Sequence, residues 1–205
     1  MIDPALFFGF AFAALLIELT PGPNMAWLVT LSISEGRKAG LAATVGIGLG
    51  LAFLAGLSAI GLAAVIASSD LAYEALRWAG ALFMLYLAWE GWRAAGESST
   101  ALRTARHTAH AARGFVINAL NPKAAVFYIT VMPQFISPSL PAQPQALLLA
   151  LSSVAIATTI HALLVLLAGS LRTFIDDEAQ NRMIRRVLSV ALVGIAVWLF
   201  LSAAR

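Results

Sequence analysis

Two short stretches of the sequence, half the chain apart, combine helix-breaking residues with polar side chains that could bind a small polar molecule. The first is Thr20-Pro21-Gly22-Pro23-Asn24, and the second runs from Asn118 to Asn121-Pro122-Lys123. Proline removes a backbone donor and clashes with the carbonyl four residues before it, so neither stretch continues an unbroken helix. Thr20-Pro21 and Asn121-Pro122 are both typical of a capping side chain followed by proline at the first helical position. The unpaired N–H groups of such a helix start favour a bound carboxylate.

Two ionisable residues accompany these breaks. Glu18 precedes the first, and Lys123 belongs to the second. A charge at the centre of a membrane helix costs about 2.5–3.5 kcal/mol, so each needs a partner or water. We expect Glu18 to be neutral at rest, because burial disfavours the charged form, and this suits a role in proton coupling. Lys123 could bind a substrate carboxylate; the alternatives are a structural pair with Glu18, or an ammonium that reaches the membrane surface.

The composition indicates the elements that must carry these stretches. Of 205 residues, 60% are hydrophobic and only 11% are charged, against roughly 25% charged in soluble domains. This predicts a polytopic membrane protein and excludes a soluble enzyme or a nucleic-acid-binding protein, despite the net charge of +3. Cysteine is absent, and neither a phosphate-binding glycine loop nor a metal-ligand cluster is present in the sequence, so we expect no metal and no cofactor.

Apolar segments long enough to cross a bilayer occur six times along the chain. A single transmembrane domain over 1–205 is therefore expected, with halves of about 1–93 and 114–205 joined by a polar linker at about 94–113. Because three spans per half is an odd number, the halves would be inverted, and the breaks would fall at matching positions of spans one and four, which points to a transport site. The predicted spans are about 5–34, 39–67, 71–93, 114–137, 145–171 and 184–203.

The basic residues predict an orientation. Of the thirteen Lys and Arg, ten fall in the loops after the first, third and fifth spans, which the positive-inside rule places in the cytoplasm. Both termini would then lie outside a bacterial inner membrane. The ten residues are Arg37, Lys38, Arg93, Arg103, Arg106, Arg113, Arg172, Arg182, Arg185 and Arg186.

Several of these motifs resemble those of the LysE/RhtB family of amino-acid exporters. They are Leu19 to Asn24, Gly36-Arg37-Lys38-Ala39-Gly40 with Gly46, Gly48 and Gly50, and Asn121 to Ala125 leading to Met132-Pro133-Gln134-Phe135. The resemblance covers nearly the whole chain. It implies an inner-membrane exporter of neutral or basic amino acids or close derivatives, driven by the proton gradient, with the transport path at the two proline motifs. The apolar stretch 50–55 departs from the family pattern, in which a polar residue such as His is frequent, and so does Glu18.

The resulting prediction is a secondary-active exporter, not an enzyme, that works by antiport with protons. Asn24, Asn118 and Asn121 would hydrogen-bond the substrate, and Glu18 would bind its amine or a proton. The alternatives are a passive channel, an assembly protein, or an intramembrane enzyme built on a Ser58–His161 pair. The expected partners are an amino acid, protons and membrane lipids. The small residues four apart in the second span are typical of helix packing and could also serve a homodimer.

Overall fold

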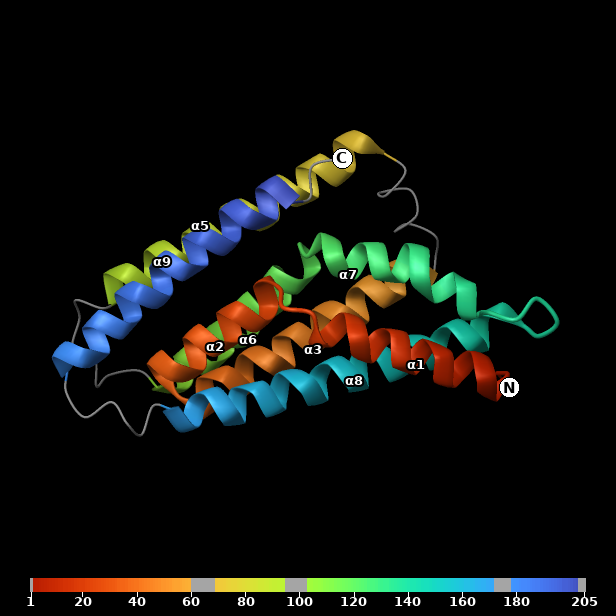
Figure 1. Cartoon of the computed structure of the whole chain (residues 1–205), viewed down its shortest axis with the longest axis horizontal. Helices are drawn as coiled ribbons and strands as arrows, with labels where there is room; N and C mark the ends of the chain where they lie inside the picture. The colour runs from red at the N-terminus through yellow and green to blue at the C-terminus, as the bar shows by residue number, and fades with distance from the viewer. Residues whose placement is uncertain (1, 60–68, 95–102, 172–177, 203–205) are drawn as a thin grey trace.

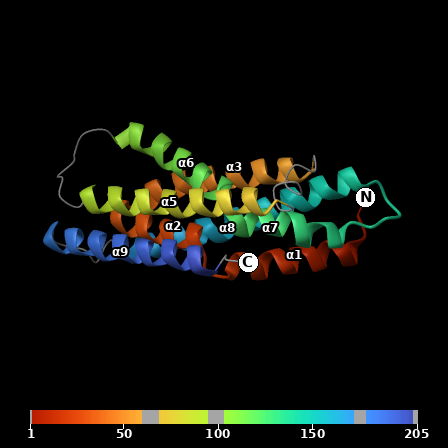
Figure 2. The same ribbon diagram turned by 90° about the horizontal axis from the view of Figure 1, so that it is seen from above.

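The computed structural model describes residues 2–59, 69–94, 103–171 and 178–202, and this part of the chain is helical and contains no strand. The helices pack lengthwise into an elongated bundle (Figures 1 and 2). Two of them, α5 (Asp70–Ala94) and α9 (Glu178–Ser202), form a pair along one side. The remaining helices form the body of the bundle. The predicted all-α class is therefore confirmed for the described residues.

The helices that carry the two proline motifs are bent. In the first, α1 (Pro4–Leu19) and α2 (Pro23–Glu35) meet at 56°. In the second, α6 (Arg103–Ala119) is followed by α7 (Pro122–Val126), and the chain bends by 53°. A π-helix, Phe127–Val131, and a 3₁₀ turn, Met132–Phe135, continue from α7. The prediction of two broken helices is confirmed.

The two bent pairs run in opposite directions along the bundle. In Figure 1 the pair α1–α2 starts at the end that holds the N-terminus, whereas α6–α7 runs toward that same end. The helix α3 (Arg37–Ala59) returns from the end of α2, and α8 (Ala142–Leu171) returns from the end of the second bent segment. Residues near the breaks are thereby brought together at mid-length.

The length and composition of these helices fit a membrane protein. Among the described residues, Arg37–Ser58 and Ala142–Leu171 are each long and apolar enough to cross a membrane. Counting each bent pair as one span raises the number of candidate spans to four. The helices α5 and α9 have 25 residues each but carry more charged residues. The arrangement of six spans thus stays a prediction.

Glycines allow the closest helix contact in the bundle, between α3 and α6. A methyl group added at Gly46 would lie 1.8 Å from the carbonyl oxygen of Ala111, and one added at Gly114 would lie 2.2 Å from that of Ala43. The two backbones therefore touch directly, as small residues permit in membrane helices. This confirms the packing role predicted for the small residues of the second span.

Two helices start earlier than predicted. The helix α6 begins at Arg103, so residues 103–113, expected in the polar linker, are helical. The reason is visible in its packing: the side chain of His110 is buried, and Gly114 lies against α3. The helix α9 begins at Glu178, before the predicted start at 184. The first half of the predicted linker, 95–102, lies outside the described residues.

Candidate functional site

The first break differs in detail from the prediction. Thr20 does not start the second helix; it ends α1, and its hydroxyl donates to the carbonyl of Leu16 at 3.0 Å. The new helix starts one proline later, with Gly22 as the capping residue and Pro23 at the first helical position. The predicted Thr20-Pro21 cap is therefore wrong. Either proline could start a helix, but the hydroxyl of Thr20 hydrogen-bonds backward into the helix that it ends.

The second break follows the prediction. Asn121 caps α7, and its side-chain oxygen accepts a hydrogen bond from the backbone N–H of Lys123 at 3.0 Å. Pro122 occupies the first helical position and is buried. The two breaks therefore correspond as Gly22-Pro23-Asn24 and Asn121-Pro122-Lys123. In both motifs, a polar residue follows the proline that begins the new helix.

A hydrogen bond joins the two breaks. The amide nitrogen of Asn24 donates to the side-chain oxygen of Asn118 at 2.6 Å, and both side chains are buried. The oxygen of Asn24 and the amide nitrogen of Asn118 have no hydrogen-bond partner. Because a buried polar atom without a partner is costly, these two atoms are suited to a ligand that offers both a donor and an acceptor. An amino acid has both.

Lys123 reaches across from the second break to the first. Its ammonium donates to the carbonyl of Ile17 at 2.6 Å and to that of Thr20 at 2.8 Å. Both carbonyls lie at the end of α1, where helix carbonyls carry partial negative charge. That of Ile17 also accepts a hydrogen bond from the backbone N–H of Thr20 at 3.1 Å. The Lys123 ammonium gives these carbonyls hydrogen-bond donors and a charge opposite to their own partial charge. The Lys123 side chain also passes Gly22, where an added methyl group would lie 3.9 Å from the nitrogen.

Glu18 pairs with His161 of α8. The carboxylate lies 3.6 Å from Nε2 of the imidazole, whose side chain is buried. The second imidazole nitrogen, Nδ1, has no hydrogen-bond partner. Glu18 and Lys123 thus contact different groups, and the direct Glu18–Lys123 pair considered above is not among the ion pairs of the described residues. The signal for His161 in the sequence was a single histidine within an apolar span.

A small cavity lies where these side chains meet. Its volume is about 20 Å³. Since one water needs about 10–15 Å³ of such space, the cavity has room for about one water. It is partly open, and Thr20, which lines it, is exposed. The predicted site residues Glu18, Thr20, Gly22, Asn24, Asn118, Asn121 and Lys123 line it together with Ala14, Ile17, Met25, Leu51, Ala124, Phe127, Tyr128, Ser153 and His161. Pro21, Pro23 and Pro122 shape the breaks but do not line the cavity.

The π-helix supplies one wall that the sequence did not predict. Tyr128 is buried there, and its hydroxyl hydrogen-bonds the hydroxyl of Ser153 at 2.8 Å. Ser58 donates to the backbone carbonyl of Tyr128 at 3.1 Å. Ser58 thus binds the π-helix, while His161 faces Glu18, so the structure does not form the Ser58–His161 pair that an enzyme would need. Single-turn π-helices are frequent at functional sites.

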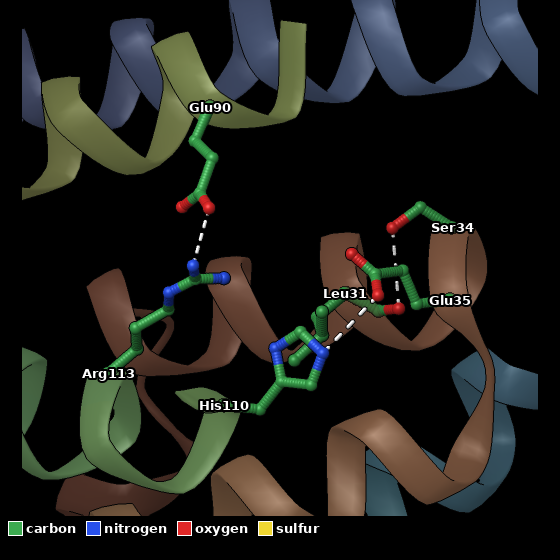
Figure 3. Close-up of polar contacts among 6 residues, drawn as sticks. All are labelled: Leu31, Ser34, Glu35, Glu90, His110 and Arg113. Carbon is green, nitrogen blue, oxygen red and sulfur yellow. Dashed lines mark hydrogen bonds and ion pairs between the residues drawn. The ribbon is translucent and has the colours of Figure 1, made fainter. Parts of the chain in front are cut away.

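A second polar cluster joins three helices away from this cavity (Figure 3). His110 of α6 lies 3.3 Å from the carboxylate of Glu35, the last residue of α2. One helical turn away, the guanidinium of Arg113 pairs with Glu90 of α5. The helix α6 is therefore tied to α2 on one side and to α5 on the other. These contacts lie near the end of the bundle that the basic residues predict to be cytoplasmic.

A family model and several known proteins are similar in sequence to this chain. The family model described as LysE type translocator matches residues 15–203. A homoserine/homoserine lactone efflux protein of Salmonella typhimurium is 29% identical, and the alignment covers 87% of this chain and 88% of that protein. A leucine efflux protein of Enterobacter sp. is 31% identical over 65% of this chain and 64% of that protein.

An uncharacterized membrane protein of Vibrio cholerae is 32% identical, with 76% of this chain and 77% of that protein aligned. No solved structure matches the chain. The family match spans both breaks and almost every helix. The chain therefore belongs to the LysE type translocator family, whose members are translocators and not enzymes.

Proposed function

We propose that this protein exports amino acids or close derivatives across the bacterial inner membrane by antiport with protons. The observation that carries the proposal is the joining of two mid-helix breaks by the buried Asn24–Asn118 hydrogen bond beside a small cavity. Broken helices are tolerated inside a membrane where they line a protein cavity, and transport sites are built at such places. The relatives that are named as efflux proteins support the direction of transport.

The site offers complementary groups for the two ends of an amino acid. The first backbone N–H groups of α2 follow Pro23 and lie where a carboxylate would be favoured. Lys123 adds a positive charge next to Gly22. Glu18 and the unpaired oxygen of Asn24 are acceptors for the α-ammonium. Asn118 and Asn121 would hydrogen-bond the remaining polar atoms of the substrate.

Proton coupling would use the Glu18–His161 pair. A carboxylate and an imidazole 3.6 Å apart can share or exchange a proton after a small movement. Both line the same cavity as the proposed substrate site. Competition between a proton and the substrate amine for Glu18 would therefore couple the inward movement of protons to export.

The proposed architecture has six spans in two inverted halves, with both termini outside. The opposite directions of the two bent pairs support it (Figure 1). Because the chain contains no cysteine, single cysteines report orientation without background. In intact cells, an impermeant maleimide should label Ser139→Cys and should label Lys38→Cys only after permeabilisation. Both positions are exposed. The reverse pattern would contradict the proposed orientation.

The function is tested by feeding cells dipeptides that release leucine or homoserine, the amino acids in the names of the relatives. Cells that overproduce the protein should accumulate less of at least one free amino acid than control cells. A protonophore should abolish this difference when export is against the gradient. Flux that persists only down the gradient would favour the passive channel, and unchanged accumulation across a wider dipeptide panel would contradict the proposal.

A further inference from the structure

The end of α1 already holds an ammonium group, and it belongs to the protein. Lys123 donates to the carbonyls of Ile17 and Thr20 at 2.6 and 2.8 Å. The α-ammonium of an amino acid has the same charge and the same three donors, so these carbonyls would accept it equally well. Ile17, Thr20 and Lys123 all line the cavity. One place that suits the substrate amine, at the end of α1 beside Glu18, is therefore occupied by a side chain.

The size of the cavity indicates what this occupancy means for transport. With about 20 Å³ of free space, the cavity has room for about one water while Lys123 lies in it. The carbonyls at the end of α1 are nevertheless satisfied, since a cation is present. In the absence of substrate, the helix end that lines the cavity thus still contacts a cation. This is the state that an exporter needs when it returns without an amino acid.

We propose that Lys123 is a tethered substitute for the substrate ammonium. It occupies the amine subsite at the end of α1 whenever the transporter is empty, and a substrate with a free amino group displaces it during export. This inference rests on the proposed function and adds to it the requirement for a primary ammonium. The freed Lys123 remains next to the start of α2, where it can bind the substrate carboxylate.

The proposal predicts a specific defect when the tethered charge is lost. Without Lys123, the carbonyls at the end of α1 can close into the cavity only when a substrate ammonium covers them. The empty transporter then fails to return, while the loaded transporter still moves in both directions. Net efflux should therefore fall, and exchange of internal for external amino acid should continue. A side chain that only stabilises the fold would affect both rates together.

The absence of cysteine makes a controlled test possible. Purified Lys123→Cys protein is divided into two parts. One part is alkylated with 2-bromoethylamine, which restores a lysine-like ammonium. The other part is alkylated with bromoethane, which gives a neutral chain of similar length. Both are reconstituted in liposomes with L-leucine or L-homoserine. We expect the ethylated protein to lose net efflux by about tenfold relative to exchange, and the aminoethylated protein to recover it.

Parallel loss of net efflux and exchange, or no difference between the two alkylated forms, would overturn the inference while leaving the export function in place. Wild-type liposomes that move none of the probe amino acids would instead contradict the proposed function, and the inference with it.

A second test uses the wild-type protein and needs no variant. L-leucine methyl ester, which keeps the ammonium, should inhibit leucine efflux, and N-acetyl-L-leucine, which keeps only the carboxylate, should not. The opposite pattern would also overturn the inference.

Discussion

Asn24 and Asn118 share a buried hydrogen bond of 2.6 Å although they are 94 residues apart in the sequence. Asn24 follows Pro23, and Asn118 lies in the last turn of α6. Lys123, which follows Pro122, makes the matching contact with the last turn of α1. In both cases, the residue after the proline of one break binds the end of the other bent helix. The two breaks are thus held together by reciprocal contacts.

Replacing either asparagine should damage the site through the partner that remains. Asn24→Ala removes the donor to the buried side-chain oxygen of Asn118, and a buried acceptor without a partner costs about 1–3 kcal/mol. Export and the midpoint of thermal unfolding in detergent should both fall for each single variant. The double variant, Asn24→Ala with Asn118→Ala, should be little worse than either single one, because the shared bond is lost only once.

Fully additive losses of stability in this double-mutant cycle would indicate that the bond contributes nothing. Ser152→Ala is a suitable control, since Ser152 lies on α8 outside the cavity and hydrogen-bonds only within its helix.

The prolines at the breaks should be required for export and not for insertion into the membrane. Replacing Pro21, Pro23 and Pro122 by alanine restores backbone donors and removes the clashes that prevent a continuous helix. We expect the protein to be produced at normal levels and export to fall to background. Pro144→Ala is the matched control, because Pro144 lies near the start of α8 and is exposed. Normal export by the triple variant would contradict the broken-helix mechanism.

The sequence was sufficient to predict the helical class, the two breaks and seven of the sixteen residues that line the cavity. These features depend on local chemistry: proline ends helices, and a capping asparagine starts them. The choice between Pro21 and Pro23 as the start of α2 was not predictable in this way, because both are compatible with a helix start. In the structure, α2 begins at Pro23, Asn24 donates to Asn118, and the hydroxyl of Thr20 hydrogen-bonds back into α1.

The partners of Glu18 and Lys123 could not be predicted for a different reason. Opposite charges near two adjacent breaks suggest a direct pair, but the end of α1 offers Lys123 two carbonyls, and α8 places His161 beside Glu18. Both partners come from the arrangement of helices and not from a motif. Tyr128 was missed for a similar reason, since the π-helix that holds it has no clear sequence pattern.

The contact between α3 and α6 predicts a sharp difference between two glycines of one helix. Gly46→Ala would place a methyl group 1.8 Å from the carbonyl oxygen of Ala111, so the helices must separate. Overpacking of this kind typically costs about 1–3 kcal/mol. Gly56→Ala meets nothing within 4 Å and should be neutral or slightly stabilising. Thermal unfolding in detergent compares the two, and equal midpoints would contradict the close contact.

The Arg113–Glu90 pair should stabilise the attachment of α5 to α6. Both side chains are partly exposed, so the expected contribution is small, about 1 kcal/mol or less. Reversing one charge, as in Glu90→Arg, places two cations together and should lower the unfolding midpoint. Combining it with Arg113→Glu should recover most of the loss. If the double reversal is as unstable as Glu90→Arg alone, the pair does not hold the two helices together.

Glu18 should be needed for coupling more than for binding. Glu18→Gln keeps the size and hydrogen-bonding ability of the side chain but cannot carry an exchangeable proton, and it removes the charge that faces His161. In liposomes with an imposed proton gradient, we expect the variant to lose gradient-driven transport of its amino acid and to retain exchange at equal pH on both sides. Glu74→Gln, on α5 and outside the cavity, is the matched control and should respond to the gradient as the wild-type protein does. Retention of full gradient-driven transport by Glu18→Gln would remove Glu18 from the coupling mechanism and leave His161 as the next group to test.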